Sequence, residues 1–124
     1  MARILVVDDS NLARRMTRKI LESAGHDVID VQDGITALER YFLMKPQIVL
    51  LDMTMREMDG LEVLKRLRDM DPNAMAIFVT ADVQSSTREM AAQGGACGFV
   101  MKPVVASDLL VAVNTALEGS SSCN

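Results

Sequence analysis

Short apolar segments alternate along the chain with longer stretches in which apolar residues recur every three or four positions. The short segments are rich in Val, Ile and Leu, which is typical of strands buried on both faces of a sheet. They predict strands at residues 3–7, 28–31, 47–51, 75–79 and 98–101. The stretches between them predict helices. Their expected inward residues are Leu12, Met16, Ile20 and Ala24; Ile35, Leu38 and Tyr41; Leu61, Leu64 and Leu67; and Leu109, Leu110, Val113, Ala116 and Leu117. A weaker helical pattern covers residues 85–93.

This succession of strand–helix units predicts an α/β fold of the (βα)5 type. Right-handed crossovers between parallel strands place helices on both faces, so the five-stranded sheet is expected to be doubly wound. A length of 124 residues with 49% hydrophobic content suits a single domain with one core.

Composition narrows the possible functions. Thirteen Lys and Arg against 17 Asp and Glu give a net charge of −4, which argues against nucleic-acid binding by this domain. No apolar run approaches the length of a membrane span, and the N-terminal residues enter a strand pattern at once, leaving no room for a signal peptide. A cytoplasmic protein without a membrane partner is therefore expected.

Polar residues stand where the predicted strands end. Asp8-Asp9 follows the first strand, Asp52 the third, Thr80 the fourth and Lys102 the fifth. In open α/β sheets, ligands bind beyond the carboxyl ends of the strands, at the switch in strand order. These side chains are therefore expected to face one crevice.

Three carboxylates in one crevice need a partner. Two of them about 4 Å apart repel by roughly 4 kcal/mol at an effective dielectric constant near 20. An all-oxygen site of this kind suits Mg²⁺, with Mn²⁺ possible. Three carboxylates, one divalent cation and Lys102 sum to zero charge. With a phosphoryl dianion on Asp52 the sum becomes −1, and Thr80 is placed to donate a hydrogen bond to it.

Each residue also has a simpler interpretation. Asp8-Asp9 could form a turn with helix N-terminal charges, and Asp52 could be a capping residue. Lys102 could be a solvated strand-end lysine, and Thr80 ordinary strand content. The i,i+4 pair Arg14 and Arg18 is typical of a solvated helix face.

Five motifs in order resemble the receiver domain of two-component response regulators, in particular the single-domain receivers of the chemotaxis type. The motifs are Asp8-Asp9, residues 50–60, Val79-Thr80-Ala81, residues 95–99 and Lys102-Pro103, and the resemblance runs from Arg3 to about Glu118. It implies a flavodoxin-like sheet with strand order 2-1-3-4-5 and a cis Lys102-Pro103 bond.

The resemblance also implies a role for each site residue. Asp52 would accept a phosphoryl group from a histidine kinase or a histidine phosphotransfer protein. Mg²⁺ would be held by Asp8, Asp9, Asp52 and the backbone carbonyl of Thr54. The remaining implied roles are phosphate binding by Lys102 and Thr80, switching by Thr80 and Phe99, and tuning of phosphoryl lifetime by Thr54 and Asp82. Phe99 is also a natural core residue, and Arg14 and Arg18 lie on the helix that commonly docks the kinase in this family.

Such a domain catalyses its own phosphorylation and dephosphorylation without being a conventional turnover enzyme. In the family, helix four, strand five and helix five present the output face, so an unidentified downstream protein or a second copy of the chain is the expected partner there. Arg56 stands where the family usually has Pro, which places a cation near the site. Residues 1–118 are expected to form the receiver domain, and residues 119–124 a flexible tail or linker remnant.

Other classes fit less well. An aspartate-nucleophile phosphatase of the haloacid dehalogenase type needs Asp two residues after the nucleophile, where this chain has Thr54. A flavodoxin-like electron carrier needs a phosphate loop that Asp8-Asp9 would repel. The alternatives that stay open are a receiver cut from a larger transcription or effector regulator, and a degenerate receiver that signals by binding alone.

Overall fold

A computed structural model describes residues 2–53, 55, 57–81, 89 and 95–119. Five parallel strands form one sheet in the order β2-β1-β3-β4-β5. The strands are β1 (Arg3–Val7), β2 (Asp27–Val31), β3 (Ile48–Asp52), β4 (Ala76–Thr80) and β5 (Gly98–Met101). The described helices are α1 (Asn11–Ser23), α2 (Gly34–Met44), α3 (Gly60–Met70) and α5 (Ala106–Glu118). The α/β class and the strand order are confirmed; the helix expected at residues 85–93 lies outside the described residues.

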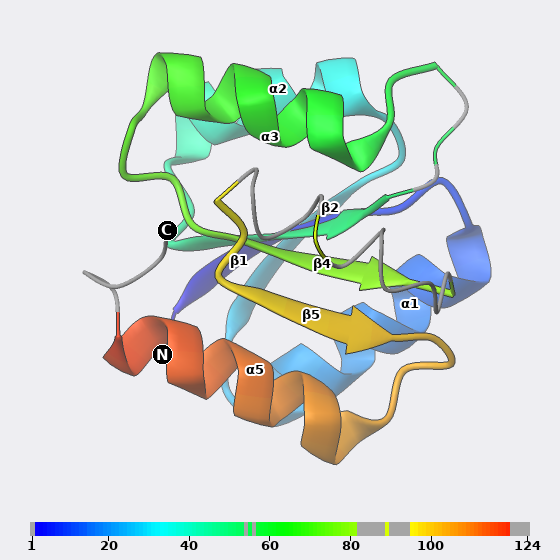
Figure 1. Ribbon diagram of the computed structural model, residues 1–124. Helices are drawn as coiled ribbons and strands as arrows, with labels where there is room; N and C mark the ends of the chain where they lie inside the picture. The colour runs from blue at the N-terminus through cyan, green and yellow to red at the C-terminus, as the bar shows by residue number, and fades with distance from the viewer. Residues whose placement is uncertain (1, 54, 56, 82–88, 90–94, 120–124) are drawn as a thin grey trace.

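Helices cover both faces of the sheet. Helices α2 and α3 lie on one face and α1 and α5 on the other (Figure 1). The strands alternate accordingly: Leu5 and Leu51 pack on the α2/α3 side, whereas Ile4 and Leu50 pack on the α1/α5 side. This alternation explains why residues 4–7, 48–51 and 76–79 of β1, β3 and β4 are all apolar, since each of them meets a helix layer. The edge strand β2 is partly polar.

Side-chain caps fix where three of the helices begin. Ser10, Asp33 and Asp59 accept hydrogen bonds from the backbone N–H groups of residues 13, 36 and 62, at the starts of α1, α2 and α3. Each cap satisfies a donor that the first helical turn leaves unpaired. Ser10 and Asp33 follow the ends of β1 and β2 within three residues, so these two caps lie at the carboxyl edge of the sheet.

The predicted inward faces of two helices are wrong in part. Leu12 and Met16 are 70% and 46% exposed, and α1 instead buries Thr17 and Leu21. A spacing of four residues advances by 400°, so the predicted stripe drifts around the helix by about 40° at each step. In α2, Ile35 is also exposed.

Ala24, also predicted to face inward, is exposed, and Ile20, Leu38, Leu61, Leu110 and Leu117 are only partly buried. Other inward predictions are confirmed. Tyr41 of α2 is buried, as are Leu64, Leu67, Leu109 and Val113 of α3 and α5.

The strand ends lie one residue later than the pattern predicted at two positions. Asp52 is the last residue of β3 and Thr80 the last residue of β4, so both belong to the sheet and both are buried.

The Lys102-Pro103 peptide bond is cis, as the resemblance implied. Within the described part of the chain, no helix combines the length and the apolar character that crossing a membrane requires.

Candidate functional site

The predicted site residues meet at the carboxyl edge of the sheet. Asp8 directly follows β1, and its N–H donates to the carbonyl of Val31 in β2 at 3.2 Å. Asp52 ends β3, while Lys102 directly follows β5. The fold therefore brings these side chains together from segments up to 94 residues apart in sequence.

Asp8, Asp9 and Asp52 form an acidic cluster. One carboxylate oxygen from each lies within 4.8 Å of the other two. Asp8 and Asp52 are only 4% and 7% exposed, whereas Asp9 faces solvent. Buried carboxylates are costly to ionise without a partner, so nearby cations are needed to stabilise this cluster in its charged form.

Lys102 supplies one of those cations. Its Nζ donates to Asp8 Oδ2 at 2.9 Å and to Asp52 Oδ2 at 3.2 Å. Burial alone would lower the pKa of Lys102, but the hydrogen bond to Asp8 and the negative charges of Asp52 and Asp8 outweigh it and raise the pKa above its ordinary value. The lysine is therefore a fixed positive charge that bridges two buried carboxylates.

The donor set fits a small divalent cation. Mg²⁺ takes oxygen ligands at about 2.1 Å, so two ligands on opposite sides of an octahedral ion are separated by about 4.2 Å. One oxygen from each of Asp8, Asp9 and Asp52 lies within 4.8 Å of the other two, so small side-chain shifts would bring all three onto one ion. With Lys102, the cluster carries a net charge of −2, which one divalent cation would neutralise. These three residues could hold the metal; Thr54, whose backbone carbonyl was the fourth predicted ligand, lies outside the described residues.

Thr80 and Phe99 lie on the neighbouring strands. Thr80 is 1% exposed, and its carbonyl accepts a hydrogen bond of 2.8 Å from the N–H of Lys102. In the β3–β4 register, Asp52 is opposite Val79, the residue before Thr80, which places Thr80 at the edge of the acidic cluster. Phe99 is partly buried and packs against the core under α2 and α3. Asp82 and Arg56, both singled out in the sequence, lie outside the described residues.

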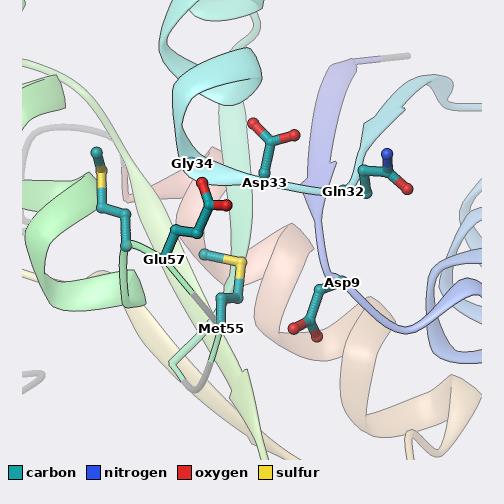
Figure 2. A pocket seen from close by; sticks show the side chains of 7 residues that line it. Asp9, Gln32, Asp33, Gly34, Met55 and Glu57 are labelled. Atoms are coloured by element: carbon teal, nitrogen blue, oxygen red, sulfur yellow. The ribbon is translucent and has the colours of Figure 1, made fainter.

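A pocket of about 260 Å³ opens beside the acidic cluster. Figure 2 shows Asp9 on one side of it and Met55 and Glu57, from the loop after β3, on the other. Its remaining lining residues are Gln32, Asp33, Gly34 and Met58. A Cβ at Gly34 would meet Val63 Cγ2 at 2.8 Å, so the glycine allows α2 to approach α3 at the pocket floor. Gln32 and Asp33 follow the second predicted strand, but the strand-end pattern is less clear there and gave them no role at the site.

Fold and site together define a doubly wound α/β domain with an acidic, lysine-bridged site at the switch in strand order. The response regulator receiver domain family matches residues 4–114, and the chain belongs to this family. It is 39% identical to the chemotaxis protein CheY of Bacillus subtilis, over 93% of this chain and 97% of that protein. It is 37% identical to the chemotaxis protein CheY of Thermotoga maritima, over 90% and 94% of the two chains.

A solved structure supports the same assignment. The CheY-like response regulator receiver domain protein of Methanospirillum hungatei superposes with a TM-score of 0.90 at 27% sequence identity, covering 98% of this chain and 97% of that one. The resemblance found in the motifs is therefore confirmed along nearly the whole chain. The protein is a receiver domain of the CheY-like kind, a class consistent with a phosphoryl-accepting switch in two-component signalling.

Proposed function

We propose that this protein is a phosphorylation-activated signalling switch in which Asp52 accepts a phosphoryl group from a phosphohistidine, with Mg²⁺ as the required cation. The observation that carries the proposal is the Lys102 ammonium, within 3.2 Å of both Asp8 and Asp52 at the edge of a three-carboxylate cluster. Anionic oxygens transferred to Asp52 would enter a site that already presents one fixed cation and room for a second.

The residues divide the chemistry between them. An oxygen of Asp52 attacks phosphorus, the P–N bond to the donor histidine breaks, and the electron pair leaves with the imidazole nitrogen. The Lys102 ammonium stabilises the negative charge that develops on the phosphoryl oxygens, and the Thr80 hydroxyl donates a hydrogen bond to one of these oxygens. A bound Mg²⁺ would supply further charge neutralisation and be held by Asp8, Asp9, Asp52 and the Thr54 carbonyl. Hydrolysis by water later releases inorganic phosphate and restores the carboxylate, so the domain catalyses both steps on itself.

The lifetime of the phosphoryl group on Asp52 is proposed to depend on residues close in sequence to Asp52 and to Thr80. Thr54, two residues after Asp52, and Asp82, two residues after Thr80, are proposed to tune access of the hydrolytic water. Arg56, in place of the usual Pro, adds a cation to the same loop.

An apolar groove next to Lys102 is the proposed docking surface for the phosphodonor. Leu12 is 70% exposed and Met16 46% exposed, although both are large apolar side chains. The groove, about 160 Å³ in volume, runs between α1 and the segment that follows β5. It is lined by Ser10, Leu12, Ala13, Met16, Lys102, Pro103 and Val104. A histidine-bearing helix of a histidine kinase or phosphotransfer protein that packs its apolar face here would bring its phosphohistidine toward Asp52.

Output is proposed to use a neighbouring surface, formed by β5 and α5. Thr80 and Phe99 lie on adjacent strands near the site, so a shift of Thr80 toward the phosphoryl group is proposed to change the packing of Phe99 and the surface formed by β5 and α5. On that surface Val111 is 64% exposed and offers an apolar contact for a downstream protein or a second copy of the chain. Similarity to two chemotaxis proteins along nearly their full length favours chemotaxis as the pathway.

The test is the intact mass of the protein after incubation with acetyl phosphate, with Mg²⁺ or with EDTA. Wild type with Mg²⁺ is expected to gain the mass of one phosphoryl group, and Asp52→Asn is expected to gain none. Transfer from a radiolabelled, purified phosphohistidine protein then tests the donor class. Failure of both donors to modify wild type would overturn the proposal and leave a degenerate receiver that signals by binding.

A further inference from the structure

Arg14 ties the first helix to the loop that carries Asp8 and Asp9. Its side chain, in the first turn of α1, is only 14% exposed. Nε donates to Asp30 Oδ2 of β2 at 2.9 Å, one terminal nitrogen donates to the backbone carbonyl of Asp8 at 2.8 Å, and the other donates to Asn11 Oδ1 at 2.6 Å. A residue expected on a solvated helix face is thus one of the most constrained polar side chains near the site.

The bond to the Asp8 carbonyl matters because the rest of that residue lies in the acidic cluster. The Asp8 carboxylate accepts from the N–H of Ser10 at 2.9 Å and from Lys102 Nζ at 2.9 Å. Asp8 is therefore held at its carbonyl by Arg14 and at its carboxylate by two other donors. Asp9 shares the peptide unit whose carbonyl Arg14 binds, so its direction depends on the same hydrogen bond.

Asp30 anchors the guanidinium from the other side. Its Oδ2 accepts from Arg14, and its Oδ1 accepts from Arg18, which also pairs with Glu22 at 3.1 Å. Arg18 is 41% exposed and lies farther along α1, whereas Arg14 is enclosed between β2 and the loop after β1. A guanidinium holds two acceptors in fixed directions, which an ammonium cannot do.

We infer that Arg14 is a positioning residue for the divalent-cation site. Through the Asp8 carbonyl it fixes the orientation of the Asp8 and Asp9 carboxylates toward Asp52. The inference rests on the proposed function, because it assumes that these carboxylates bind Mg²⁺. Partners that orient metal ligands typically change metal affinity by about 10- to 100-fold when they are removed. Since Arg14 acts through the backbone, the lower end, about tenfold, is expected for Arg14→Ala.

The chain offers a control in Arg3, a more exposed arginine with the same kinds of partners. Arg3 Nε pairs with Asp27 of β2 at 3.2 Å, and its terminal nitrogen donates to the backbone carbonyl of Met44 at 3.2 Å. Like Arg14, it joins a β2 aspartate to a main-chain carbonyl, but at the amino edge of the sheet. Arg3→Ala removes the same kinds of bonds without touching the loop after β1.

The experiment measures Mg²⁺ binding by isothermal titration calorimetry, with thermal unfolding in EDTA recorded on the same samples. Arg14→Ala is expected to raise the Mg²⁺ dissociation constant about tenfold, Arg14→Lys to raise it by an intermediate factor, and Arg3→Ala to leave it within twofold of wild type. If Arg14→Ala does not fold, Arg14→Lys and Asp30→Asn take its place, with the same direction expected.

Unchanged Mg²⁺ affinity in folded Arg14 variants would overturn the inference, as would an equal loss in Arg3→Ala, which would indicate general loosening of the fold. Failure of the proposed function would give a different result. Wild type itself would then bind no Mg²⁺, or would bind Mg²⁺ and still accept no phosphoryl group.

Discussion

The acidic cluster predicts that removing one of its charges stabilises the metal-free protein. Asp9→Asn is the suitable change, because Asp9 is exposed and its amide variant keeps the shape of the side chain. In metal-free buffer the variant is expected to unfold at a higher urea concentration than wild type. With saturating Mg²⁺ the order is expected to reverse, because the variant has lost a charged ligand.

The magnitude follows from the spacing of the carboxylates. At the observed limit of 4.8 Å, two unit charges repel by about 3.5 kcal/mol at an effective dielectric constant of 20, and by about 0.9 kcal/mol in bulk water. Asp9 faces solvent, so its repulsion from each of Asp8 and Asp52 lies near the lower value, and Lys102 offsets part of it. A net stabilisation of about 1 kcal/mol is therefore expected for Asp9→Asn. Added NaCl should reduce it, because salt screens exposed charges.

The assay is urea unfolding followed by far-ultraviolet circular dichroism, since the chain has no Trp to report by fluorescence. Mg²⁺ at 100 times its dissociation constant should stabilise wild type by about 2.7 kcal/mol, and the variant by clearly less. Asp33→Asn is the matched control: it lines the same pocket, and Asn caps α2 as well as Asp does, so a change within about 0.5 kcal/mol is expected. The reasoning fails if Asp9→Asn is destabilised in EDTA, or if Mg²⁺ stabilises both proteins equally.

Two further predictions concern backbone packing and a buried hydrogen bond. Gly60→Ala places a Cβ 2.5 Å from the carbonyl oxygen of Asp52 and 2.8 Å from Phe78 Cε1, so a loss of about 2 kcal/mol is expected in urea unfolding; an unchanged midpoint would contradict the close packing. Tyr41→Phe removes the 2.7 Å hydrogen bond from the phenol to Asp71 and should cost about 1–2 kcal/mol at neutral pH. Burial, and then that hydrogen bond, raise the pKa of Tyr41 above its ordinary value of 10.0, so wild type should lose stability as the pH rises above about 10, and the Phe variant should lose less. Parallel slopes for the two proteins in that range would refute the assignment.

The sheet was predictable because its signal is local. A strand that is buried on both faces must be apolar throughout, and residues 3–7 or 75–79 have few other interpretations. The face that a helix buries is less predictable, because a four-residue spacing and a true inward stripe diverge after two turns. For this reason the sequence pattern predicts Leu12 and Met16 to be core residues, although the structure exposes both and buries Leu21 instead.

The site residues were predictable where their sequence signal is local, and were missed where their contacts are long-range. Asp8, Asp52 and Lys102 each end an apolar strand, and the sheet edge brings such positions together whatever the loops contain. Arg14 carried no comparable signal. Its helical spacing from Arg18 describes a face of α1, whereas its contacts to Asp30 and to the Asp8 carbonyl depend on how α1 crosses β2. Interactions of that kind are set by tertiary packing.

Lys102 connects the acidic cluster to the segment that precedes α5. It follows β5, yet its partners Asp8 and Asp52 stand at the ends of β1 and β3, so it crosses the end of β4 to reach them. Three carboxylates and Lys102 sum to −2, and a divalent cation brings the sum to zero. Under the proposed function, a phosphoryl dianion on Asp52 changes it to −1 and gives the ammonium a stronger partner than the carboxylate it replaces. Only residues 103–105 separate Lys102 from the start of α5. Under the proposed function, this short covalent connection would link the charge at Asp52 to the surface proposed for output.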